Sequence, residues 1–61
     1  MKMTKLAQMR KQRNLTQTEL AEKCGWKKST ISEWERGTRN PNIEKLQILA
    51  HALDCTITEL I

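Results

Sequence analysis

The sequence predicts an all-α fold, built from five short helices in a single compact domain that covers residues 1–61. Apolar residues recur three and four positions apart along most of the chain, which is the spacing of one helix face. Two segments begin with a threonine that is followed three residues later by a glutamate, a pattern that caps helix N-termini. The low aromatic content of 3% and the single proline disfavour a β-sandwich or a barrel.

The first helix is expected from about Thr4 to Arg13. Leu6 and Met9, together with Met3, lie three residues apart and therefore share one face of this helix. Asn14 follows it, and asparagine is a residue that tolerates the left-handed backbone at which many helices end.

The second helix is expected to begin after Thr16, which forms a capping box with Glu19. Leu20 and Ala21 are predicted to face the core. Gly25 ends the helix, because glycine adopts the left-handed conformation of a helix C-terminus without steric cost.

The third helix is expected to begin near Lys27 or Lys28, to bury Ile31 and Trp34, and to end at Gly37. Only a tight turn at residues 24–26 separates it from the second helix. Two short helices joined in this way form a helix-turn-helix. In that motif the second helix enters the DNA major groove with its N-terminal residues leading.

The fourth and fifth helices follow a loop at residues 38–41, where Pro41 disfavours helical backbone at the preceding residue. Asn42 is the expected cap of the fourth helix, and Thr56 with Glu59 is the capping box of a short fifth helix. The residues predicted to form the buried face of these two helices are Ile43, Leu46, Leu49, Ala50, Leu53, Ile57 and Leu60.

The positive charge is concentrated in one part of the chain. Residues 1–40 contain ten Lys and Arg against four Glu, a net +6, whereas residues 41–61 contain one Lys against two Glu and one Asp, a net −2. A basic half is typical of a surface that binds a polyanion, although a solvated basic surface is the simpler alternative. No apolar run approaches 18 residues and no secretory signal is evident, so we expect a cytoplasmic protein without a membrane span.

The residues resemble the phage-repressor and Cro-like helix-turn-helix family (the xenobiotic-response-element type) along the whole chain. The matching motifs are Met9-Arg10, Leu15-Thr16-Gln17, Leu20-Ala21, Gly25, Ser29-Thr30-Ile31, Trp34-Glu35-Arg36-Gly37, Asn40-Pro41, Ala50, Leu53 and Glu59-Leu60. The resemblance implies a five-helix, lambda-repressor-like fold that binds a double-stranded DNA operator, usually as a homodimer on an inverted repeat. Repression by occupying that operator is the expected mechanism. Two positions depart from the family pattern: Trp26 stands where a small aliphatic residue is usual, and Ile48 where a polar one is usual.

Four residues of the third helix are candidates for reading bases: Lys27, Lys28, Ser29 and Glu33. Lysine can donate to guanine O6 and N7, and glutamate can accept from cytosine N4. The resemblance places base-reading side chains at these positions. The sequence leaves open which lysine reads a base, and an ordinary polar helix face is the alternative.

Phosphate contacts are expected from Gln17, Thr30, Arg36, Arg39 and Asn40. Gln17 lies at the first turn of the second helix, where an amide and the free helix N–H groups can hold a phosphate oxygen. Each of these residues is otherwise a solvated polar side chain. Arg36 in particular also suits the negative end of the third helix dipole.

The resemblance also implies a structural salt bridge between Arg10 and Glu35, which would hold the third helix onto the first. It implies that small relatives pair near their C-terminal segment. We therefore expect a dimer interface at Ile57, Thr58 and Ile61, with Ile48 as a further candidate. The basic motif face would repel its own copy, which leaves the slightly acidic half for this contact.

The remaining reactive residues predict no further chemistry. Cys24 and Cys55 lack a zinc-ligand spacing, so buried free thiols are expected, with no metal, cofactor or small-molecule ligand. His51 is expected at the surface. No nucleophile, base and orienting group recur together, so an enzyme is not predicted.

Two alternatives stay open. Trp26 and Trp34 can stack on bases, as in single-strand binders, although packing in the core is the expected role. The whole domain can also be a protein-interaction module of the same fold, such as an antitoxin-like or anti-regulator domain. Lys27, Lys28 and Arg39 on one face favour DNA.

Overall fold

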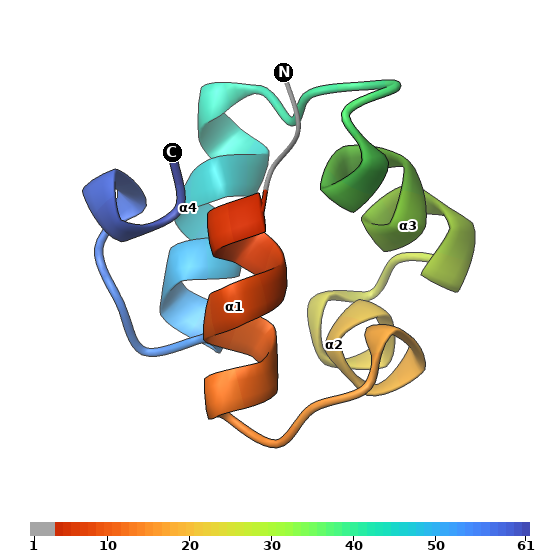
Figure 1. The fold of residues 1–61 in the computed structure, drawn as a ribbon, viewed down its shortest axis with the longest axis horizontal. Coiled ribbons are helices and arrows are strands. Elements are labelled where there is room, and N and C mark those ends of the chain that lie inside the picture. The colour runs from red at the N-terminus through yellow and green to blue at the C-terminus, as the bar shows by residue number, and fades with distance from the viewer. Residues whose placement is uncertain (1–3) are drawn as a thin grey trace.

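The computed structural model describes residues 4–61, which form four α-helices and one turn of 3-10 helix. The elements are α1 (Thr4–Gln12), α2 (Gln17–Cys24), α3 (Lys28–Arg36), α4 (Ile43–Ala52) and the 3-10 turn η1 (Ile57–Glu59). Figure 1 shows α2 and α3 on one side of α1 and η1 on the other, with α4 partly behind α1 in this view; α4 also packs against α2. The all-α prediction is confirmed. The helices α1, α2 and α3 begin and end within one or two residues of the expected positions, and α4 begins directly after the predicted cap Asn42.

The core fills the space between these helices. Six side chains are almost completely buried: Leu6, Leu20, Ile31, Leu49, Leu53 and Leu60. Met9, Ala21, Trp34 and Ala50 complete the buried set. The face predicted for α1 by Leu6 and Met9 is confirmed, and the predicted Met3 lies outside the described residues. Every helix therefore contributes to one shared core, which fixes α2 and α3 relative to the rest of the domain.

The predicted caps hold the helix ends. The Glu19 amide donates to the Thr16 side chain over 3.1 Å, and the Thr16 amide donates back to the Glu19 carboxylate over 2.8 Å. The Asn42 side chain accepts from the amide of Lys45 over 2.9 Å at the start of α4. Because these bonds satisfy otherwise unpaired helix N–H groups, they define where each helix begins.

The prediction that Ile43 faces the core is wrong, because its side chain is 59% exposed. Ile43 is the first residue of α4, and side chains tilt towards the N-terminus of their helix. At this position the side chain points past the end of the core, although it shares the face of Leu46. Leu46 itself is half-buried and packs against the core.

The predicted fifth helix is also wrong in kind, since η1 is a single 3-10 turn. Its hydrogen bonds run from the Glu59 amide to the Thr56 carbonyl and from the Leu60 amide to the Ile57 carbonyl, over 3.1 and 2.9 Å. With three residues per turn, Ile57 and Leu60 lie on the same side. Both residues pack against the core, Leu60 fully buried and Ile57 partly buried.

An interaction that the sequence did not reveal joins the ends of α1 and α4. The Arg13 guanidinium donates to the backbone carbonyls of Leu53 and Asp54 over 2.7 and 3.1 Å. These carbonyls lie just after α4, where helix carbonyls lack partners and a cation is favoured.

Among residues 4–61 there is no helix of the length and apolar character needed to cross a membrane.

Candidate nucleic-acid interface

The turn between α2 and α3 fixes how α3 leaves the domain. Gly25 has φ of +79°, the left-handed conformation expected for it, and its amide donates to the Glu22 carbonyl over 3.2 Å. The Trp26 amide donates to the Ala21 carbonyl over 2.8 Å, which closes the end of α2. Lys27 is then extended as the N-cap of α3. The chain therefore reverses within three residues, and α3 packs directly against α2 (Figure 1).

The four predicted base-reading residues lie together on α3. Lys27, Lys28 and Ser29 are exposed at its N-terminal end, while Glu33 is partly exposed one turn further along. Ser29 and Glu33 are four residues apart and so share one helix face. The opposite face buries Ile31 and Trp34, as the sequence predicts. Residues able to donate to or accept from base edges are thus directed away from the core.

A hydrogen-bonded network holds α3 from behind. Arg10 binds the Glu35 carboxylate through Nε and Nη2, over 2.7 and 3.2 Å, and donates from Nη1 to the Leu15 carbonyl over 2.9 Å. The Arg10 and Glu35 side chains are only 11% and 10% exposed. The structure therefore contains the ion pair that the family resemblance implied. The pair ties α3 to α1 and to the loop that precedes α2.

Gln17 joins this network, which the sequence did not reveal. Its Nε2 donates to Glu35 Oε1 over 3.0 Å, so one of its two amide hydrogens is already engaged inside the protein. The side chain is half-buried. Gln17 thus contacts the scaffold that supports α3, and only its second amide hydrogen is left for the predicted phosphate contact.

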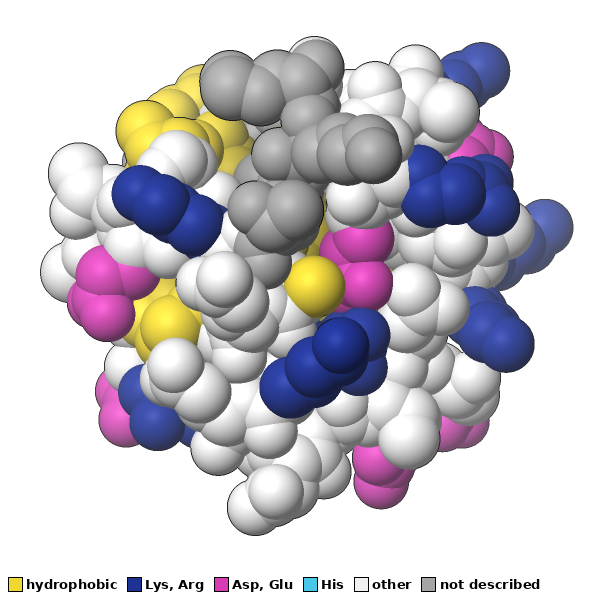
Figure 2. All heavy atoms as spheres, viewed as in Figure 1, with side chains coloured by type: hydrophobic (Ala, Val, Ile, Leu, Met, Phe, Trp, Pro, Cys, Tyr) yellow, Lys and Arg dark blue, Asp and Glu magenta, His cyan; other side chains and the backbone are white. Residues whose placement is uncertain are grey.

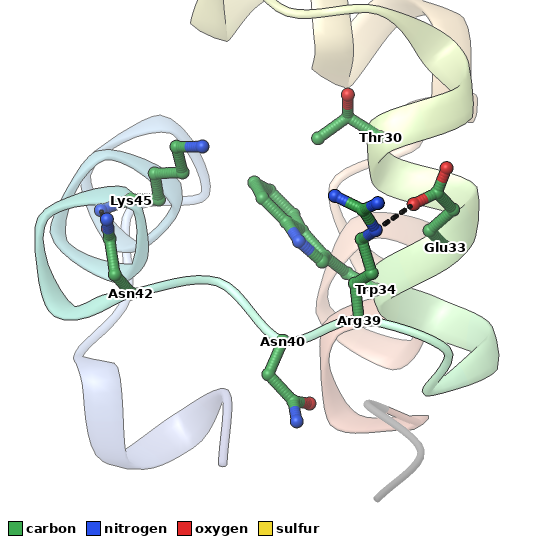
Figure 3. A pocket seen from close by; sticks show the side chains of 7 residues that line it. All are labelled: Thr30, Glu33, Trp34, Arg39, Asn40, Asn42 and Lys45. Atoms are coloured by element: carbon green, nitrogen blue, oxygen red, sulfur yellow. Dashed lines mark hydrogen bonds and ion pairs between the residues drawn. The ribbon is translucent and has the colours of Figure 1, made fainter.

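Three of the other predicted phosphate contacts, Thr30, Arg39 and Asn40, line an open hollow of about 380 Å³ between α3 and α4. Figure 3 shows Arg39 reaching from the loop towards Glu33, and Lys45 approaching Trp34 from α4. Arg39 Nε lies 3.3 Å from Glu33 Oε2, and the Arg39 side chain is 80% exposed. The residues that line the hollow are Thr30, Glu33, Trp34, Arg39, Asn40, Asn42 and Lys45. Arg36 is not among them and lies exposed at the end of α3.

Lys45 is a basic residue of this hollow that the sequence analysis missed. Its Nζ lies 5.9 Å from the centre of the Trp34 ring, within the range of a cation–π contact. The three-residue spacing from the cap Asn42 was the available signal, since it puts Lys45 in the first turn of α4. Lys45 therefore adds a cation to the α3 side of the domain from the half with net negative charge.

Trp26 and Trp34 pack against each other. Their ring centres are 5.1 Å apart and their planes are inclined by 85°, an edge-to-face arrangement. Trp34 is 4% exposed and belongs to the core, whereas Trp26 is half-buried against it. The expected core role of these tryptophans is thus confirmed, and burial of Trp34 leaves its ring no room to stack on a base.

The residues predicted to form a dimer interface differ in exposure. Ile61 and Ile48 are 60% and 45% exposed, and Thr58 is exposed as well. Ile57 is partly buried and packs against the core, so only part of its side chain faces solvent. Figure 2 shows hydrophobic side chains at the surface over the C-terminal turn, and Lys and Arg side chains along the α3 side.

The two cysteines are free thiols, and both are half-buried where the sequence predicted full burial. Burial raises the pKa of the Cys24 thiol, and burial together with the nearby Glu59 carboxylate raises the pKa of Cys55. Both residues are therefore protonated and weakly nucleophilic near neutral pH. Within residues 4–61 no three His, Cys, Asp or Glu side chains gather as a metal site. His51 is exposed, as the sequence predicts.

Known proteins with similar sequences are regulators of transcription. The transcriptional activator BcrR of Enterococcus faecalis is 42% identical over 57 residues, which are 93% of this chain and 28% of BcrR. The uncharacterised transcriptional regulator y4dJ of Sinorhizobium fredii is 38% identical over 90% of this chain and 71% of its own length. The immunity repressor of Bacillus phage phi105 is 36% identical over 87% of this chain and 37% of the repressor. This chain thus spans only about a quarter to two fifths of the activator and the phage repressor.

Solved structures with the same fold have similar sequences too. The restriction-modification controller protein C.AhdI of Aeromonas hydrophila superposes with a TM-score of 0.89 at 34% identity, over 95% of this chain and 84% of that one. The clp gene regulator ClgR of C. glutamicum superposes with a TM-score of 0.86 at 30% identity, over 93% of this chain and 74% of that one. The helix-turn-helix family HTH_3, which is the Cro/C1 type, matches residues 6–60. This chain belongs to that family.

Proposed function

We propose that this chain binds double-stranded DNA in a sequence-specific manner and regulates transcription. One observation carries the proposal: the N-terminal end of α3 presents exposed Lys27, Lys28 and Ser29, while the rest of the helix is held by the core and by the Arg10–Glu35 pair. A rigid helix with an exposed basic leading end fits the major groove of DNA. Membership of a family whose named relatives are transcriptional regulators supports the same proposal.

Within this proposal, Lys27, Lys28, Ser29 and Glu33 read bases and the surrounding polar residues hold phosphates. The phosphate contacts are Gln17, Thr30, Arg36, Arg39 and Asn40, to which we add Lys45. Phosphate contacts fix the register of the protein on DNA, and base contacts then select the sequence. The finer proposal is that the chain represses transcription by occupying an inverted-repeat operator as a homodimer.

Selection of bound sequences from a random pool of duplex DNA tests this function. We expect one enriched motif, arranged as an inverted repeat, and an affinity that falls steeply with salt because condensed counterions are released on binding. A Lys27→Ala/Lys28→Ala variant is the matched control, since both side chains are exposed and the fold should survive. Failure of the wild-type protein to enrich any sequence, even at low salt, would instead support a protein-interaction module.

The direction of regulation needs a separate measurement. A promoter that carries the selected motif over its start site, placed before a reporter gene, should lose expression when this protein is produced. Repression follows because a bound domain of this size covers the site that the polymerase needs. Increased expression would contradict the repressor assignment while leaving DNA binding intact.

A further inference from the structure

Glu33 and Arg39 form one unit that joins the face of α3 to the loop after it. Arg39 Nε lies 3.3 Å from Glu33 Oε2. Figure 3 shows the guanidinium beside the carboxylate, next to the Trp34 ring. A carboxylate has two oxygens and a guanidinium has five N–H donors. Pairing through Nε and Oε2 therefore leaves donors on Arg39 and an acceptor on Glu33 for other partners.

The backbone holds the two residues together independently of this ion pair. The Glu33 carbonyl accepts from the Gly37 amide over 3.0 Å and from the Thr38 amide over 3.1 Å. The Thr38 hydroxyl donates to the same carbonyl over 3.1 Å. Gly37 has φ of +83°, which turns the chain back over the end of α3. The loop that carries Arg39 is therefore anchored on the backbone of Glu33. Because of this anchor, less conformational entropy is lost when the two side chains meet.

The opposite charges of Glu33 and Arg39 determine how this pair would act on DNA. A carboxylate on the outward face of α3 would approach a polyanion and be repelled by the phosphates. An arginine on one carboxylate oxygen offsets that repulsion, and the other oxygen can accept from cytosine N4. The same guanidinium can donate its terminal N–H groups to a phosphate. We infer that Arg39 is a positioning residue that links a phosphate to Glu33, so that Arg39 helps to determine the base preference of α3.

This inference rests on the proposed function and deepens it. It distinguishes Arg39 from Arg36, an exposed cation on the same side of the domain that is in no ion pair recorded for residues 4–61. If both residues only held phosphates, removal of either would weaken all sequences alike. If Arg39 also positions Glu33, its removal weakens the base preference at one position of the site in addition.

The test compares the sequence preferences of Arg39→Ala, Arg39→Lys, Arg36→Ala and Glu33→Gln with wild type, using selection from random duplex DNA and a salt titration of each. We expect Arg39→Ala and Arg36→Ala each to reduce the salt slope by about one unit. Arg39→Ala alone should also weaken the preference at the position read by Glu33, by about two- to fivefold, and Arg39→Lys should retain part of it. Thermal melts check that each variant is folded.

The double variant Glu33→Gln/Arg39→Ala completes the design. In the Glu33→Gln background, loss of Arg39 should lower affinity uniformly without a further change in preference, because the carboxylate that Arg39 positions is gone. An unchanged preference in Arg39→Ala, with uniform weakening, would overturn the inference and leave Arg39 as a phosphate contact within an intact proposed function. Absence of any selected motif for the wild-type protein would overturn both.

Discussion

Glu35 holds α3 in position through its carboxylate. It accepts from Arg10 of α1 and from Gln17 of α2, so three helices meet at one nearly buried charge. A buried ion pair adds little net stability compared with an apolar pair of the same shape, because both charges lose water. Removal of one of the two charged side chains, however, leaves the other charge buried and uncompensated. The network therefore specifies how α3 sits more than it stabilises the fold.

Removal of either partner should accordingly be severe. We expect Arg10→Ala or Glu35→Ala to lower the free energy of unfolding by about 3–5 kcal/mol, which approaches the whole stability of so small a domain. Urea denaturation measures the change. Arg39→Ala is the matched control, because its pair with Glu33 is largely exposed and should contribute about 0–1 kcal/mol. Melting temperatures for the Arg10 and Glu35 variants within a degree or two of wild type would contradict this prediction.

The leading end of α3 leads to a prediction about recognition. Lys27→Ala, Lys28→Ala and Glu33→Ala should each cost about 1–3 kcal/mol of binding on the selected site where the side chain truly reads a base, and relax the preference at one position. A lysine that only holds a phosphate should weaken all sequences alike. Binding curves on the selected site and on single-base variants separate the two roles. Wild-type affinity in all three variants would refute base reading by this helix.

At the scale of the elements, signals within four residues in sequence were sufficient to predict the four α-helices, but not that the last turn is 3-10. The helix ends are marked by the Thr16–Glu19 capping box, by the Asn42 cap, and by Gly25 and Gly37 at the ends of α2 and α3. Each of these signals acts on the adjacent helical turn, so the sequence alone identifies them. The contact of Gln17 with Glu35 and that of Arg13 with the end of α4 join residues far apart in the chain. Such contacts depend on how helices pack, which helical periodicity does not specify.

Gly25 offers a direct measurement of one of these local signals. Its φ of +79° is strained for any L side chain, yet a Cβ built there would meet nothing within 4 Å. Gly25→Ala should therefore destabilise the domain through backbone strain alone, by about 1–2 kcal/mol. Gly25→Asn should cost less, because asparagine tolerates this conformation better. Equal stability of the alanine variant and wild type in urea would show that the turn can relax into another conformation.

For the whole molecule, the sequence predicted a basic surface on α3 and a separate contact near the C-terminus. Burial in the folded domain changes which residues are exposed for that contact. The expected interface residue Ile57 is partly used by the core, whereas Ile61 and Ile48 remain well exposed. Ile43 adds an exposed apolar side chain that periodicity assigned to the inside. Periodicity gives the face of a helix but not where the neighbouring element ends. The extent of an exposed surface therefore follows only from the assembled fold.

Dimerisation is the last prediction, and it concerns the molecule as a unit. One helix-turn-helix covers few base pairs, so useful affinity requires two half-sites about 34 Å apart, held by a self-complementary contact. We predict that this contact includes Ile61, Thr58 and Ile48, and the exposed part of Ile57. The area is small, so the dimer should be weak in solution and form cooperatively on DNA.

Sedimentation of the wild-type protein and an Ile61→Asp variant, alone and with the selected inverted repeat, checks this prediction. Ile61→Asp places a charge in the proposed contact without disturbing the core, because this side chain is 60% exposed. Ile43→Asp is the comparison variant, since Ile43 is equally exposed but is not one of the residues proposed for the contact. The Ile61 variant should bind single half-sites normally and lose cooperativity on the full repeat, while the Ile43 variant keeps it. Wild-type cooperativity in the Ile61 variant would place the dimer contact elsewhere, since a buried aspartate in a small apolar interface would otherwise abolish it.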